Sequence, residues 1–162
     1  PSLVGSEMCI RDRIITFSAL FLLTSQLVFA NYAFYRQVVN TCKLYRMPVD
    51  EKKMSLTKKS DGSYQFTIEM QAKLRNDFET PMLVAFISVG QAIKHQENFA
   101  KKKSTYKPVI PNDTEVTVIT KISREGMVIS AKATPDQMKK LAEGKIDTAS
   151  FMRLIKNSIQ TL

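Results

Sequence analysis

The chain of 162 residues is poor in the residue types that most often carry chemistry. It has no tryptophan, two cysteines, five glycines and a single histidine, His95. Two cysteines cannot build a disulfide scaffold. One histidine without an HxH, HExxH or CxxC pattern gives no basis for a metal site. With so few glycines, and none in a GxGxxG, Walker-type or GxSxG pattern, no phosphate loop or hydrolase signature is present. The sequence therefore predicts no metal and no cofactor.

Catalysis has little support among the remaining residues. Cys42 and His95 could formally form a nucleophile pair, but the local signatures of cysteine enzymes are absent. We expect Cys42 to be a buried small hydrophobe rather than an intermolecular disulfide partner or a reactive thiol. We expect His95 to be a solvated surface residue. The acids lie on polar strand positions or at element ends, namely Glu69, Glu115, Glu125, Asp136 and Glu143. A non-catalytic protein is favoured, and a small enzyme with a scattered site is the alternative.

An apolar segment occupies residues 14–30 (IITFSALFLLTSQLVFA). A bilayer-spanning helix needs about 20 apolar residues, whereas this run is shorter and is interrupted by Thr24, Ser25 and Gln26. Val28 and Ala30 supply the small residues of an export cleavage site. The segment predicts a secretory signal peptide cleaved before Asn31, with an uncleaved membrane anchor as the alternative.

The residues before this leader have a different origin. The stretch PSLVGSEMCIRDR resembles, over residues 2–13, a translated sequencing-adaptor tail that recurs at the ends of environmental reading frames. The resemblance implies that residues 1–13 are an artefact, that Cys9, Arg11 and Arg13 are not protein sequence, and that the source is an environmental bacterium. Residues 31–162 resemble no family, and their 132 residues suit a single domain.

Positive charge is the strongest compositional signal. The chain has 24 basic and 15 acidic residues, which gives a net charge of +9. Charge of this size bears on partners, and we expect an anionic envelope polymer, a lipid headgroup or an acidic protein. Export argues against nucleic acid, and a membrane is expected only through an uncleaved leader. Lysines surround one tyrosine after residue 100, which predicts an anion-binding patch of Lys101, Lys102, Lys103, Tyr106 and Lys107.

The first half of the domain predicts a helix, a β-hairpin and a second helix. Helical spacing of apolar residues predicts a helix over 33–45. Residues 63–75 alternate between apolar and polar, as in a half-buried antiparallel strand, with inward positions from Tyr64 to Leu74. They pair with a strand over 54–57 through Asp61-Gly62, a preferred type I′ turn pair. Thr80-Pro81 then predicts a helix capped by Thr80 that runs to Lys102.

The second half repeats this order. Alternation predicts strands over 116–122 and 127–133, joined by a turn at 124–126. Thr134-Pro135 with Gln137 forms a capping-box pattern for a helix that ends at Gly144. Asp147 can cap a last helix, whose expected apolar stripe is Phe151, Leu154, Ile155 and Ile159.

Together these elements predict an α+β domain in ββαββα order. The expected architecture is a two-layer sandwich with a four-stranded antiparallel sheet and helices on one face. We expect an exported domain, periplasmic or extracellular, that binds or scaffolds an anionic partner. A small exported enzyme and a carrier of an apolar ligand between sheet and helices are the alternatives, and the oligomeric state is left open.

Overall fold

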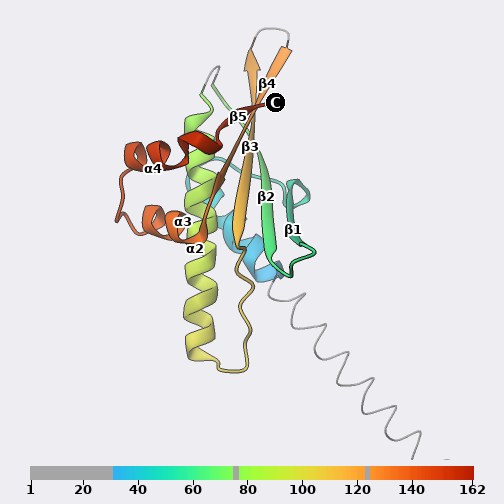
Figure 1. Ribbon diagram of the computed structural model, residues 1–162, viewed down its shortest axis with the longest axis vertical. Helices are drawn as coiled ribbons and strands as arrows, with labels where there is room; N and C mark the ends of the chain where they lie inside the picture. Colours follow the sequence, from blue (N-terminus) through green and yellow to red (C-terminus); the bar gives the residue numbers. More distant parts are fainter. Residues whose placement is uncertain (1–30, 75–76, 123–124) are drawn as a thin grey trace, which may run out of the picture.

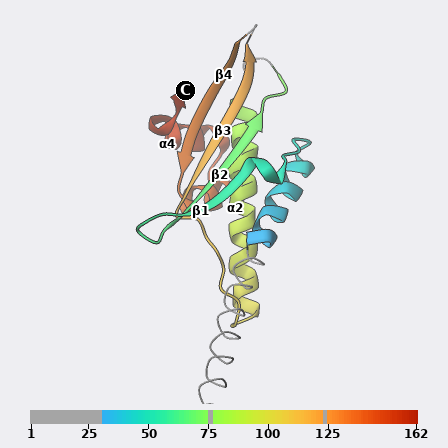
Figure 2. The same cartoon turned by 90° about the vertical axis from the view of Figure 1, so that its right-hand side faces the viewer.

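A computed structural model describes residues 31–74, 77–122 and 125–162. The predictions made for residues 1–30 and for the turn at 124–126 fall wholly or partly outside the described residues. The described chain is an α+β fold in which helices pack against a five-stranded sheet (Figure 1). Figure 2, turned by 90°, shows a face of the sheet, with the longest helix behind it. The predicted α+β class is confirmed.

The elements follow one another with short connections. Residues 31–44 form helix α1. The others are a 3₁₀ helix at Glu51–Lys53, β1 at Met54–Lys58, β2 at Tyr64–Gln71, α2 at Glu79–Lys102, β3 at Asp113–Ile122, β4 at Glu125–Ala133, α3 at Pro135–Ala142, α4 at Thr148–Ile155, a 3₁₀ helix at Lys156–Ser158 and β5 at Gln160–Thr161.

The sheet is mixed, so the predicted four-stranded antiparallel sheet is wrong. Its order is β1-β2-β3-β4-β5, and β2 pairs with β3 in parallel, with Ile68 opposite Val116. The cause is α2. A helix of 24 residues rises about 36 Å, which returns the chain to the end of the sheet where β2 began. A strand that enters there beside β2 must run parallel to it.

The ββαββα order is also incomplete. Helix α1 precedes the first hairpin, and β5 follows α4 and pairs with β4, with Gln160 opposite Ser130. The Leu162 N–H donates to the Val128 carbonyl at 2.9 Å and extends this pairing. A strand of two residues is too short to show alternation, so no period-2 signal marks it.

The first hairpin forms as predicted, but its turn is not type I′. That turn requires positive φ at both central residues. Here Gly62 has φ +85°, and Asp61 is not among the positive-φ residues of the described chain. Lys59 and Ser63 are joined by a backbone hydrogen bond of 2.8 Å, which closes a loop of three residues. The Asp61 carboxylate accepts from the Ser63 backbone N–H at 2.9 Å and orders this loop.

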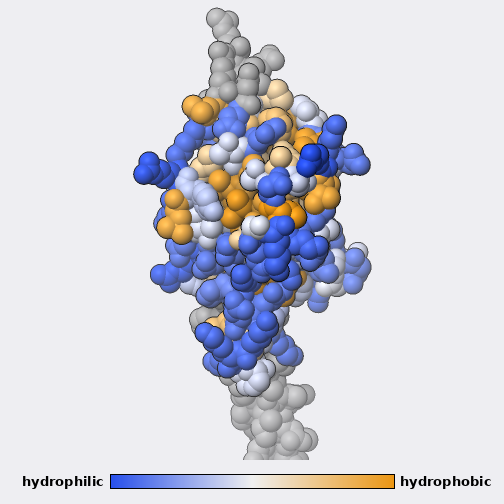
Figure 3. Space-filling view, turned by 90° about the vertical axis from the view of Figure 1, so that its left-hand side faces the viewer, coloured by the Kyte–Doolittle hydropathy of each residue, from blue (hydrophilic) through white to orange (hydrophobic). Residues whose placement is uncertain are grey.

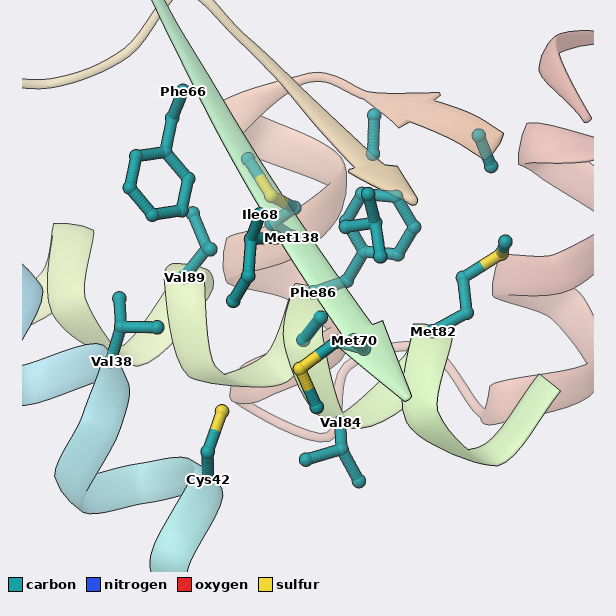
Figure 4. Packing of buried hydrophobic residues seen from close by; sticks show 14 of the residues in the cluster. Val38, Cys42, Phe66, Ile68, Met70, Met82, Val84, Phe86, Val89 and Met138 are labelled. Carbon is teal, nitrogen blue, oxygen red and sulfur yellow. The ribbon is translucent and has the colours of Figure 1, made fainter. Parts of the chain in front are cut away.

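The core lies between the sheet and the helices. Phe66, Ile68 and Met70 of β2 are buried, as their alternation predicts, and Phe66 packs edge-on against Phe34 of α1 at 5.1 Å. Figure 4 shows Val38 and Cys42 of α1 beside this strand and α2. Leu74 was expected to point inward but is 68% exposed, because β2 ends at Gln71.

The last helix buries a narrower stripe than expected. Phe151 and Ile155 are buried, whereas Leu154 is 56% exposed, so its inward assignment is wrong. A helix of eight residues that contacts the core along a narrow stripe buries one i, i+4 pair, here Phe151 and Ile155. The position next to this stripe, Leu154, then faces solvent. Ile159, the fourth residue of the predicted stripe, lies beyond α4 and is half-buried.

Two of the three predicted helix caps are confirmed. Thr134 and Gln137 form the reciprocal capping box of α3, and the Asp147 carboxylate accepts from the Ser150 N–H at the start of α4. Thr80 does not cap α2. The helix begins at Glu79, and the Asp77 carboxylate accepts from the Thr80 N–H at 3.1 Å. An acid one turn earlier therefore has the role expected of the threonine.

Helices α2 and α3 approach each other very closely at Gly90. A Cβ atom on this residue would lie 2.3 Å from the backbone carbonyl oxygen of Met138 and 2.9 Å from Cβ of Ala142. Only a residue without a side chain fits this contact. The Gln91 amide donates to the Ala142 carbonyl at 2.9 Å, which ties the same two helices together.

Candidate anion-binding site

The first described turn of α1 lies beside the end of α2. Tyr32 and Ala33 share a pocket with Phe99 and Lys103, whereas Cys42, three turns along α1, contacts Ser88 near the middle of α2. The two helices are therefore antiparallel. This packing places the first residues of the described chain at the lysine-rich end of the domain.

A pocket of about 440 Å³ opens at this end. We call it the aromatic–lysine pocket, and its lining residues are Tyr32, Ala33, His95, Phe99, Lys103, Thr105 and Tyr106. Two of these share one face of α2, because His95 and Phe99 are spaced i, i+4, and Lys103 directly follows the helix as its C-cap residue. Its size falls in the range of small-molecule sites.

Tyr106 is held in place as a wall of the pocket. After α2 the chain turns back, with the Tyr106 N–H donating to the Lys103 carbonyl at 2.9 Å. The phenol donates to the Gln96 side-chain oxygen at 2.5 Å, and the ring meets Phe99 edge-on at 4.8 Å. Partial burial raises the pKa of the Tyr106 phenol. The ring is therefore neutral and fixed, and it offers an apolar surface.

The lysines around this pocket form no ion pairs within the described chain, and the nearest preceding acid, Glu97, is paired with Lys139 at 2.9 Å. Lys101 and Lys102 lie in the last turn of α2, Lys103 follows them, and Lys107 is exposed in the next segment. No acid occurs between Asn98 and Asn112. Within the described residues none of these four lysines forms an ion pair, whereas seven other lysines do.

The end of α2 retains a strong positive charge. A helix C-terminus carries roughly half a negative charge, which offsets only a small part of four ammonium groups. Figure 3 shows the side of the molecule over α3 and α4, with apolar side chains in its middle and the end of α2 below them covered with hydrophilic residues. An anionic group that approaches this end meets excess positive charge.

The structure brings together part of the predicted site. Lys103 and Tyr106 line the pocket, whereas Lys101, Lys102 and Lys107 lie outside its lining. Reasoning from sequence missed the other lining residues, Tyr32, Ala33, His95, Phe99 and Thr105. His95 is exposed as expected, yet it is also part of this wall. The i, i+4 spacing of His95 and Phe99 on α2 was the available signal.

A second hollow, of about 330 Å³, lies on the sheet beside β1 and β2. It is lined by Lys52, Lys53, Met54, Ser55, Thr67, Ile68, Glu69 and Thr117. Lys53 pairs with Glu69 across this hollow. Because its acid and one of its two lysines neutralise each other, this hollow attracts an anion less than the end of α2 does.

Cys42 and His95 do not form a nucleophile pair. Cys42 is buried, as predicted, and its thiol donates to the Ser88 hydroxyl at 3.2 Å, while that hydroxyl donates to the Val84 carbonyl. His95 lies seven residues beyond Ser88 on α2, a rise of about 10 Å. Burial raises the pKa of the Cys42 thiol, which opposes formation of the reactive thiolate.

Two further searches of the described residues bear on function. No three of their His, Cys, Asp and Glu side chains gather closely enough to hold a metal ion. None of their helices combines the length and the apolar content needed to cross a bilayer.

The space between sheet and helices is occupied by protein. Large buried side chains fill it, namely Phe34, Phe66, Phe86, Phe151, Ile68, Met82, Ile93 and Met138. Neither hollow described above lies there.

Comparison of the chain with models of protein families, with curated proteins and with solved structures gave no match.

Proposed function

We propose that this protein is a non-catalytic, exported binding or scaffolding domain of the cell envelope, periplasmic or extracellular. It binds an anionic surface through the end of α2. The observation that carries the proposal is a group of four lysines, none of which forms an ion pair among the described residues: Lys101, Lys102, Lys103 and Lys107. The nearest acid before them in sequence, Glu97, is paired with Lys139. Export rests on the leader pattern of residues 14–30.

An anionic lipid surface is the partner that the arrangement favours. Basic residues near an anionic bilayer contribute about 1 kcal/mol each. Tyr32 and Phe99, both partly exposed, provide the aromatic groups that favour the membrane interface. An anionic polymer or an acidic protein would use the same charges.

The alternatives have less support. A small exported enzyme needs converging reactive groups, and Cys42, its clearest nucleophile, is buried beside Ser88. A carrier of an apolar ligand between sheet and helices needs space that packed side chains occupy.

The test is sedimentation with lipid vesicles. We expect binding to vesicles of phosphatidylglycerol and phosphatidylcholine, none to phosphatidylcholine alone, and loss of binding between low and high salt. Lys101→Glu with Lys102→Glu should weaken binding about 30-fold or more. The matched control is Lys43→Glu with Lys156→Glu, which makes the same change in net charge at exposed positions elsewhere.

Three results would overturn the proposal. They are binding that ignores salt, binding that survives reversal at Lys101 and Lys102, and equal loss in the control. Binding of an anionic polymer such as polyglutamate but not of vesicles would assign the surface to a polymer instead. Mass spectrometry of the protein expressed with its leader tests export processing, for which we expect an N-terminus at Asn31.

A further inference from the structure

We propose that the aromatic–lysine pocket binds a single amphiphilic anion, with its apolar part against the rings and its acidic group beside Lys103. The inference rests on the proposed function, since it names a ligand for the same end of the domain, but it adds a site that charge alone does not require. A flat lysine patch would bind an anionic surface equally well without a pocket.

The walls of the pocket determine the apolar part of the ligand. Phe99, Tyr106 and Tyr32 present three aromatic rings to the pocket. Ala33 of α1 also lines it and, with its short side chain, takes up little of the space. Phe99 is 42% exposed and Tyr32 is 53% exposed, so apolar surface at this position faces solvent. A ligand that covers these rings gains the free energy of apolar burial. The volume of about 440 Å³ accommodates one chain or one ring system.

The charged groups determine the acidic part of the ligand. Lys103 lines the pocket at its rim and has no ion-pair partner among the described residues. Lys102 and Lys107 lie close in sequence and reinforce the same sign of potential. Among the described lining residues there is no carboxylate. A cationic amphiphile would find the same rings but would be repelled, so the site distinguishes the sign of the headgroup.

The pocket is also organised in advance of binding. The hydrogen bond from Tyr106 to Gln96 and the edge-on contact between Tyr106 and Phe99 hold two of its walls. Gln96 itself is buried within α2. A ligand therefore need not order these side chains, and preorganisation of this kind favours binding.

A carboxylate or a phosphate on an acyl chain satisfies this chemistry, whether it comes from a free amphiphile or from a bilayer lipid. Calorimetric titration of the purified protein with decanoate, below its micelle concentration, tests the free form, and vesicles test the other. We expect a dissociation constant for decanoate below about 1 mM. Octanoate should bind about tenfold more weakly, and acetate and decyltrimethylammonium should not bind measurably.

Variants locate the site. Ala33→Phe fills the pocket and should weaken decanoate binding at least tenfold. The matched control, Asn40→Phe, adds the same ring at an exposed position of α1 outside the lining, and it should leave binding unchanged. Lys103→Gln tests the headgroup contact and is an exposed replacement that the fold tolerates. It should weaken decanoate binding at least fivefold.

The outcomes separate this inference from the proposed function. Lys101→Glu with Lys102→Glu should weaken vesicle binding about 30-fold or more while decanoate still binds, because neither residue lines the pocket. Vesicle binding without decanoate binding refutes the pocket alone, and decanoate binding without vesicle binding refutes the surface alone. Equal affinity for decanoate and decyltrimethylammonium, or undiminished binding by a folded Ala33→Phe protein, would also overturn the pocket. If Ala33→Phe does not fold, Lys103→Gln decides.

Discussion

Gly90→Ala should destabilise the domain, although alanine is the better helix former. In an exposed helix interior this replacement gains about 1 kcal/mol. At Gly90, however, the new methyl group would lie 2.3 Å from the Met138 carbonyl oxygen and 2.9 Å from the Ala142 methyl group. Neither the carbonyl nor the helix that carries it can rotate away, so α2 and α3 must separate.

The magnitude follows from two opposing terms. Overpacking of a close contact costs typically 1–3 kcal/mol, and a contact with backbone on both helices belongs at the upper end. Subtracting the helix-propensity gain of about 1 kcal/mol leaves a net loss of about 2 kcal/mol. For a domain of this size that corresponds to a decrease in Tm of about 6–10 °C.

Urea unfolding followed by circular dichroism measures this change. The control is Asn98→Ala, an exposed position of the same helix, which should be neutral or slightly stabilising. Combining Gly90→Ala with Ala142→Gly should recover little stability, because the nearer contact is with the Met138 carbonyl. A Gly90→Ala protein as stable as the parent, or more stable, would refute the close approach of the two helices.

Three further predictions concern single contacts. Tyr35→Phe removes the hydroxyl that accepts from the Leu56 N–H at 2.8 Å, so hydrogen exchange at Leu56 should accelerate and stability should fall by about 1 kcal/mol. The Cys42 thiol should react with a maleimide only as fast as the domain unfolds, because the thiol is buried and its pKa is raised; fast labelling of the folded protein would contradict this. Hydrogen bonds from the Ser150 backbone and side chain lower the pKa of Asp147. The stabilisation of the folded state by ionised Asp147 should therefore be complete above about pH 4 and be lost as the pH falls through the lowered pKa of this carboxyl group. Urea unfolding from pH 6 to pH 2.5 measures this loss, and Asp147→Asn should make the free energy of unfolding depend less on pH.

Local chemistry made most individual elements predictable. The alternation around Phe66, the capping box at Thr134 and the cap at Asp147 each depend on residues a few positions apart, and each appears in the structure. The cap at Thr80 was predicted wrongly, because a local pattern can offer more than one capping residue. Asp77 and Thr80 are both able to cap a helix, and only the geometry of the chain entry decides between them.

Features that join distant segments were not predictable. The parallel pairing of β2 with β3 depends on where α2 returns the chain, which no local pattern specifies. The aromatic–lysine pocket combines Tyr32 with Tyr106, which only the packing of α1 against α2 brings together. The sequence indicated the charge of the pocket through Lys103 and one of its walls through Tyr106. It did not indicate Tyr32 or Phe99, because nothing in the sequence shows which exposed aromatic residues share a surface.

The contact between Tyr35 and Leu56 has a consequence for self-association. In this sheet β5 covers part of β4, and β1 is the other edge strand. Unpaired edge strands invite the addition of another chain and seed aggregates. Here the Leu56 N–H already donates to the Tyr35 hydroxyl of α1. Lys53 directly precedes β1, and Lys58 is the last of its five residues. Helix α1 thus occupies a backbone group of β1 with which a strand of a second molecule would pair. The domain should therefore resist fibril formation for as long as α1 stays packed against β1.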